Sequence, residues 1–157
     1  MTYAANTDVP SDRSRAEIER TLTRYGADGF MYGWEQTRAV IQFKAKERFI
    51  RFIVELPDRG EFLLTPSRKQ RGSPAQVDSA YDQAVRQRWR ALALVIKAKL
   101  EAVESGITEF EAEFLAHIVL PDGTTVGDWV RPQVESAYQL GTMPQMLPMP
   151  KGDNDGV

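Results

Sequence analysis

The first part of the chain, residues 11–27, shows the hydrophobic spacing of an amphipathic helix. Its apolar positions recur at i, i+4 and i+7 and so share one helix face: Ile18, Leu22 and Tyr25. Ser14, followed three residues later by Glu17, is typical of a capping box at a helix start. Gly26 is a common residue type just beyond a helix end. The pattern predicts a short first helix.

The hydrophobic period changes to two over residues 29–56, which indicates strands. The alternating apolar positions form three groups: Phe30, Tyr32 and Trp34; Ile41, Phe43 and Ala45; and Ile50, Phe52, Val54 and Leu56. Short polar breaks at residues 36–38 and 47–48 fit hairpin turns. We therefore expect a three-stranded antiparallel meander, with residues 61–65 as a candidate fourth strand.

A long helix is predicted after the loop of residues 65–72. Ser73 and Pro74 favour a helix start and Gly106 favours its end, so the helix is roughly 45 Å long. Its apolar positions form one stripe that is expected to pack on the sheet: Val85, Trp89, Leu92, Ile96, Leu100 and Val103. The first five of these are predicted to be nearly fully buried. Almost opposite lies an alanine ridge, formed by Ala84, Ala91, Ala98 and Ala102. Small side chains allow close helix approach, so the ridge could contact a helix of the same chain or of another subunit.

Two shorter helices are predicted in the C-terminal part. The first, within residues 108–120, has a capping box at Thr108 and Glu111 and stacks Phe110, Phe114 and Ile118 on one face. The second is helical after Asp128, with Pro132 bending or delaying its start. Its apolar side consists of Trp129, Val134, Ala137 and Tyr138.

The predicted architecture is α+β in one domain. Residues 1–10 are expected to form a flexible arm, residues 11–141 a single domain, and residues 142–157 a Pro/Met-rich, partly disordered tail. The domain would consist of an N-terminal helix, the meander, the long helix packed on the sheet and the two C-terminal helices.

Composition narrows the chemistry that the chain can perform. The 157 residues carry a formal net charge of −2, no cysteine and a single histidine, His117. Disulfides, thiolate metal sites and cysteine nucleophiles are therefore excluded, and no phosphate-binding loop or nucleophile elbow is found. Glu109 and Glu113 are interpreted as a solvated helix face, and Glu113 with His117 is too small a set for a metal site. We expect no enzyme, no cofactor and no metal. The absence of a signal sequence and of a long apolar run predicts a cytosolic protein.

Charge is unevenly distributed along the nearly neutral chain. Between Arg68 and Lys99 there are eight basic residues and two acidic ones, Asp78 and Asp82. Such a local excess is what contacts with nucleic-acid phosphates require. The candidate nucleic-acid-binding residues are Arg68, Lys69, Arg71, Arg86, Arg90 and Lys97. Arg88 and Lys99 fall on the other flank of the long helix. The alternative is a solvated flank in which basic stems cover apolar surface and pair with Glu101 and Glu104.

Tyr32 and Trp34 form a second candidate nucleic-acid feature. Aromatic side chains on one face of a strand can stack on single-stranded bases. The alternative is that these side chains belong to the core, where aromatic residues are common.

Several long segments resemble a family of small, functionally unassigned proteins of tailed phages and prophages. They are DRSRAEIERTLTRYGADGFMYGW, RQRWRALALVIKAKLEAVESGI, FEAEFLAHIVLPDGTTVGDW and the ending GTMPQMLP. The resemblance implies a phage product that acts in the cytoplasm of the bacterial host. It carries no catalytic or binding residue onto this sequence.

Two functions remain open at this point. The first is an accessory protein of DNA replication or recombination that binds nucleic acid, in particular single-stranded DNA, through the basic loop and helix flank. The second is a protein-interaction module, such as an inhibitor of host defences or a regulator of a phage or host enzyme. The alanine ridge and residues 143–149, rich in Met and Pro, would serve the second function, and the ridge would also serve a homo-oligomer.

Overall fold

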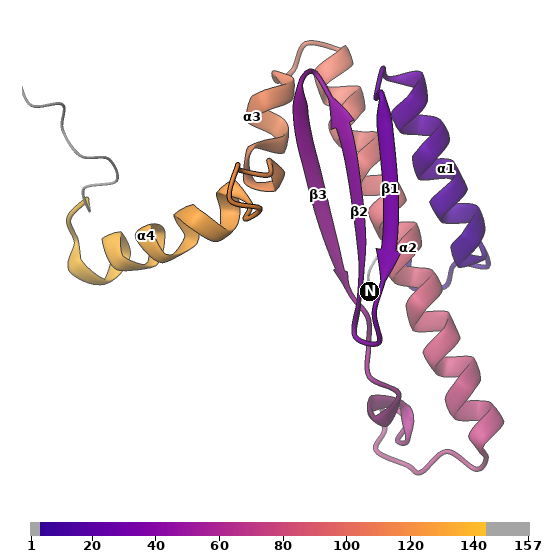
Figure 1. Cartoon of the computed structure of the whole chain (residues 1–157). Coiled ribbons are helices and arrows are strands. Elements are labelled where there is room, and N and C mark those ends of the chain that lie inside the picture. Colours follow the sequence, from indigo (N-terminus) through magenta and orange to yellow (C-terminus); the bar gives the residue numbers. More distant parts are fainter. Residues whose placement is uncertain (1–3, 144–157) are drawn as a thin grey trace, which may run out of the picture.

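The computed structural model describes residues 4–143 and has the predicted α+β fold. The helices are α1 (Ser11–Arg24), α2 (Pro74–Glu104), α3 (Phe110–Phe114) and α4 (Val126–Leu140). The strands are β1 (Gly29–Trp34), β2 (Arg38–Ala45) and β3 (Arg48–Glu55), and two short 3-10 turns are η1 (Arg59–Phe62) and η2 (Leu115–His117). Figure 1 shows the sheet lying across α2, with α1 beside β1 and α4 extending away from the sheet.

The three strands form the predicted antiparallel meander in the order β1-β2-β3. Phe30 pairs with Phe43, and Ile41 with Phe52, so the alternating apolar residues of the three strands share one face. Lys46 and Glu47, both with positive φ, form the tight turn between β2 and β3.

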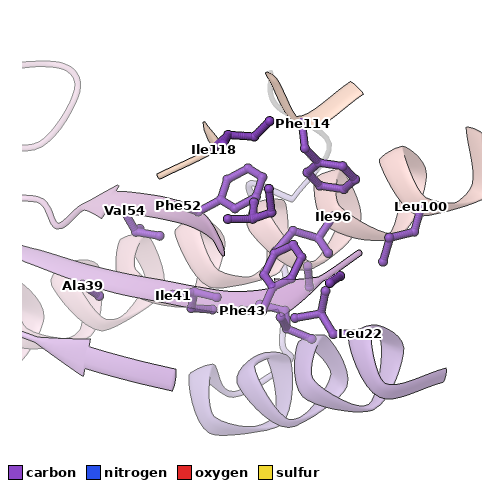
Figure 2. Packing of buried hydrophobic residues seen from close by; sticks show 14 of the residues in the cluster. Leu22, Ala39, Ile41, Phe43, Phe52, Val54, Ile96, Leu100, Phe114 and Ile118 are labelled. Atoms are coloured by element: carbon purple, nitrogen blue, oxygen red, sulfur yellow. The ribbon is translucent and has the colours of Figure 1, made fainter. Parts of the chain in front are cut away.

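The core lies between this sheet face, α1 and α2. Figure 2 shows Phe43 and Phe52 of the sheet near Ile96 of α2 and Phe114 of α3. The rings of Phe43 and Phe52 both meet Phe114 edge to face, at centroid distances of 5.9 and 6.3 Å. The described part of the chain has no helix long and apolar enough to cross a membrane.

The buried stripe of α2 differs in detail from the predicted one. Trp89, Ile96 and Leu100 are buried as expected, but Val85 and Leu92 are only partly buried. Ala93 is buried in their place. The reason is that α1 packs on one flank of α2, which turns the fully covered side of α2 toward α1. The helix limits agree with the prediction, because the Ser73 hydroxyl accepts a hydrogen bond from the Gln76 amide and Gly106 has φ +74°.

The start of α1 is not the predicted one. The helix begins at Ser11, after Pro10, so Ser14 lies inside the first turn, is fully buried and does not form a capping box. The end is as predicted, with Gly26 at φ +91°. The described part of the expected flexible arm is anchored, because Gln83 Nε2 donates to the carbonyl oxygens of Ala5 and Thr7 at 3.2 and 3.0 Å.

The candidate fourth strand is wrong. Residues 59–62 form η1, whose start has a capping box between Asp58 and Glu61, and only an isolated bridge joins Leu64 to Gln70. A capped 3-10 turn uses the backbone groups that a strand would offer to the sheet.

The C-terminal helices also differ from their predicted starts. α3 is a single short turn preceded by Glu109 without a side-chain cap, so the capping box at Thr108 and Glu111 is wrong. α4 starts at Val126, where Thr125 and Asp128 form a capping box, and Pro132 lies within the helix. The predicted tail, residues 142–157, falls outside the described residues from residue 144 onward.

The alanine ridge faces outward. α1 and α3 contact the two flanks of α2 and the sheet contacts its core side, which leaves the ridge on the remaining side. Ala84 and Ala91 are half-buried and Ala98 is exposed. A subunit contact through this ridge remains a prediction.

Candidate nucleic-acid interface

The seam between α1 and α2 brings together basic residues from distant parts of the sequence. The two helices run side by side in the same direction, since Glu17 pairs with Arg90 and, further along both helices, the Tyr25 hydroxyl donates to Glu101. Positions on α1 are therefore matched with positions on α2 at the same height. A charged residue on the facing side of either helix lies next to the other helix.

On α1, four charged residues follow the spacing i, i+4, i+7 and i+11 of a single helix side: Arg13, Glu17, Arg20 and Arg24. Glu17 contacts Arg90 of α2, whereas the three arginines lie beyond Glu17, on the side of α1 away from the buried Ile18 and Leu22. Arg13, Arg20 and Arg24 are exposed. These three arginines therefore form a stripe along the outer edge of the α1–α2 contact.

On α2, Arg86, Arg90 and Lys97 follow the spacing i, i+4 and i+11 of one side, which is the side next to α1. We call the combined set of six cations the basic seam: Arg13, Arg20, Arg24, Arg86, Arg90 and Lys97. From Arg13 to Arg24 it extends for about 16 Å, at 1.5 Å per residue.

Two cations of the basic seam are already held by polar neighbours. Arg90 Nη1 lies 2.5 Å from Glu17 Oε2, and both side chains are mostly covered. Arg86 Nη2 donates to Gln83 Oε1 at 2.6 Å. By contrast, Arg13, Arg20 and Lys97 are exposed and have no ion pair within the described chain. The seam therefore has a fixed centre and outer cations that are free to meet a ligand.

The structure brings together only half of the predicted site. Arg86, Arg90 and Lys97 lie in the basic seam, whereas Arg68 and Lys69 are exposed in the loop before α2. The distance along α2 from Ser73, where the loop ends, to Arg86 is about 20 Å. The N-terminal arm contacts Gln83 within this interval. The convergence of loop and flank on one surface remains a prediction.

Arg71 has a structural role in the loop. Its Nη1 donates to the carbonyl oxygens of Phe62 and Leu64, at 3.0 and 2.5 Å. These bonds hold η1 and the following residues together and use donors that a phosphate would need. Arg88 points away from the seam, as predicted, and donates to the carbonyl oxygen of Glu55 on β3 at 3.0 Å.

The two candidate stacking residues have different environments. Tyr32 lies on the core side of β1, with its ring edge to face on Trp89 at 5.5 Å and the Arg15 guanidinium 4.9 Å from its centroid. Trp34, at the end of the same strand, is 71% exposed. The strand face that carries both residues therefore packs on the core at Tyr32. At Trp34 the same face extends beyond the core. The two rings do not form a shared stacking platform.

Glu113 and His117 are used in packing, so the interpretation of Glu113 as part of a solvated helix face is wrong, whereas Glu109 is exposed as expected. Lys99 Nζ lies 2.9 Å from Glu113 Oε1, and His117 stacks on Phe52 with ring centroids 4.0 Å apart. Within residues 4–143 no group of three or more His, Cys, Asp or Glu side chains could hold a metal ion.

The pKa of His117 lies below its ordinary value because burial disfavours the imidazolium, and the positive charge of Lys99 adds to this effect.

A loss of stability at acidic pH follows from the lowered pKa of His117. The unfolded chain gains a proton at His117 near pH 6.5, while the folded chain stays neutral until a lower pH. Stability is therefore fully present above that value and falls as the pH drops through it. Because His117 is the only histidine, His117→Gln should reduce the difference between urea midpoints measured at about pH 7.5 and about pH 5.5. An unchanged difference in the variant would contradict the assignment.

Comparisons with known proteins identify no relative. No family model matches the sequence, and neither characterised proteins nor solved structures give a significant match. The α1 half of the basic seam was also not identified from the sequence. The spacing of Arg13, Arg20 and Arg24 along one helix side could have revealed it. The net charge of α1 does not reveal it, because Asp12 and Glu19 offset the arginines.

Proposed function

We propose that this protein binds nucleic acid through the basic seam. One observation carries the proposal: two parallel helices each carry a basic stripe, the Glu17–Arg90 ion pair lies between the stripes, and together the stripes hold six cations. Two carboxylates at the α1–α2 contact already have partners: Glu17 pairs with Arg90, and Glu101 accepts a hydrogen bond from the Tyr25 hydroxyl. A cation row of this kind suits the phosphates of a nucleic-acid backbone, which dominate binding affinity.

Single-stranded DNA is the preferred ligand in this proposal. The outer cations sit on long side chains and span about 16 Å along the helices, a length that a flexible strand can follow. We expect binding that is independent of sequence, because contacts between these cations and phosphates carry no sequence information. The resemblance to phage proteins supports a role as an accessory protein of DNA replication or recombination in the cytoplasm of a bacterial host.

Fluorescence titration tests this proposal. Labelled 20-nucleotide DNA and RNA strands and a matching DNA duplex are titrated with the protein at about 50 mM and about 200 mM salt. We expect measurable binding at low salt that weakens steeply at high salt, because each phosphate contact contributes about −0.7 to the log–log salt slope on single strands. An absence of binding to all probes at low salt would reject the proposal.

A protein-interaction module is the second candidate, and α4 favours it. This helix has an apolar side, yet none of its residues is buried. Trp129, Val134, Tyr138 and Leu140 are all largely exposed. Exposed contiguous apolar surface of this kind often marks a site of protein association.

A further inference from the structure

The apolar side of α4 is uncovered although the start and end of the helix are well defined. Thr125 and Asp128 form a capping box at its start, and Gly141 ends it with φ +67°. Trp129 and Val134 are about half-exposed, and Tyr138 is 86% exposed. The exposed apolar side therefore belongs to a regular helix and is not the result of a frayed chain end.

The direction in which α4 leaves the body is also fixed. A Cβ atom at Gly127 would lie 2.9 Å from the carbonyl oxygen of Ala116, so only glycine permits this close approach. The Val126 amide donates to the Ile118 carbonyl oxygen at 2.9 Å. Figure 1 shows that beyond this first turn α4 extends away from the sheet and from α2.

An open groove of about 510 Å³ runs between α4 and the body. Leu115 and Ala116 of η2 contribute to one wall, and Val130 and Val134 of α4 contribute to the other. Lys99 and Arg131 also line it. Both walls are mainly apolar, and the α4 wall extends from Val126 to Val134. A helix with one apolar side fits such a groove.

We propose that the groove is occupied by α4 of a second copy of this chain, in a symmetric antiparallel pair. In this pairing Val134 lies on the two-fold axis and contacts Val134 of the second copy. Val130 then contacts Tyr138 of the second copy, because positions four residues before and after the axis meet in an antiparallel pair. The same stripe serves both copies, as a two-fold interface requires.

The charges of α4 favour this arrangement. Arg131 and Glu135 lie one turn apart beside the stripe, and neither has an ion pair within the described chain. In the antiparallel pair, Arg131 lies near Glu135 of the second copy, offset by about 3 Å along the axis. The charge pattern therefore complements itself in the antiparallel orientation.

The available surface suits a weak, reversible dimer. A 15-residue helix is about 22 Å long and about 10 Å wide, so one of its sides offers about 220 Å². In the proposed pair, this side and the groove wall that it faces are covered in both copies, which makes four surfaces of about this size. The total is about 900 Å², in the range of weak and transient interfaces.

Disulfide trapping tests the pairing directly, because the full-length chain contains no cysteine. Val134→Cys places one thiol on the two-fold axis, within disulfide reach of its counterpart. We expect rapid oxidation to a covalent dimer that is seen on a non-reducing gel. Gln139→Cys, on the polar side of the same helix, is the matched control and should stay mostly monomeric. Equal cross-linking of both variants would overturn the proposal.

Charge exchange supplies a second test by sedimentation equilibrium. The wild-type protein should sediment at twice the monomer mass at tens of micromolar. Glu135→Arg should raise the dissociation constant about tenfold or more, because it places like charges together at two symmetric positions. Combining it with Arg131→Glu should recover most of the dimer. A monomeric wild type, or a double variant as weak as Glu135→Arg, would overturn the proposal. Because these variants leave the basic seam unchanged, their outcome is independent of nucleic-acid binding.

Discussion

Ile96→Ala is expected to lower the free energy of unfolding by about 2–5 kcal/mol, the range for removing a large aliphatic side chain from a packed core. Ile96 is completely buried and belongs to the core cluster of the sheet, α1 and α2. Its truncation leaves a cavity beside Phe114, whose ring is already packed against Phe43 and Phe52.

Leu92→Ala is the matched control for this experiment. It lies one turn earlier on the same helix and also becomes alanine, but it is only partly buried. We expect a clearly smaller shift of the urea midpoint for Leu92→Ala than for Ile96→Ala, with similar m values. Equal shifts would show that the covered side of α2 is not rotated toward α1.

Reversal of two outer seam cations, Arg20→Glu with Lys97→Glu, is expected to reduce affinity for single-stranded DNA by on the order of tenfold or more. Loss of two phosphate contacts should also flatten the log–log salt slope by about 1.4. The two residues come from different helices, so the combined effect tests the seam as one surface. Each exposed substitution should change stability by no more than about 0.5 kcal/mol.

The matched control has the same change of net charge at the loop. Arg68→Glu with Lys69→Glu alters two exposed cations that lie outside the basic seam. If the seam is the binding surface, this variant should keep most of the affinity and most of the salt slope. A loss of affinity as large as that of the seam variant would show that binding occurs elsewhere or depends only on the overall charge of the protein.

The hydrophobic pattern was sufficient to predict the secondary structure of the central part of the chain. The meander follows from period-two alternation, and the limits of α2 follow from Ser73, Pro74 and Gly106, since these signals act within a few residues. Helix starts were less predictable. Ser14 and Glu17 have the spacing of a capping box, but the chain continues the helix back to Ser11 and buries Ser14.

Side-chain direction also required the tertiary structure. Tyr32 and Trp34 share a strand face, but only the structure shows that this face is the core face and that Trp89 covers Tyr32. Alternation assigns residues to two faces without saying which face is buried.

The sequence by itself determined the fold class, the sets of strand residues that share a face and the basic flank of α2, because each depends on local periodicity. Only the tertiary structure decided which flank of α2 lies against α1, and so joined Arg13, Arg20 and Arg24 to that flank. It also decided that α4 leaves the body with its apolar side exposed. The physical reason is that both features depend on how helices pack, and packing is set by contacts between residues far apart in the chain.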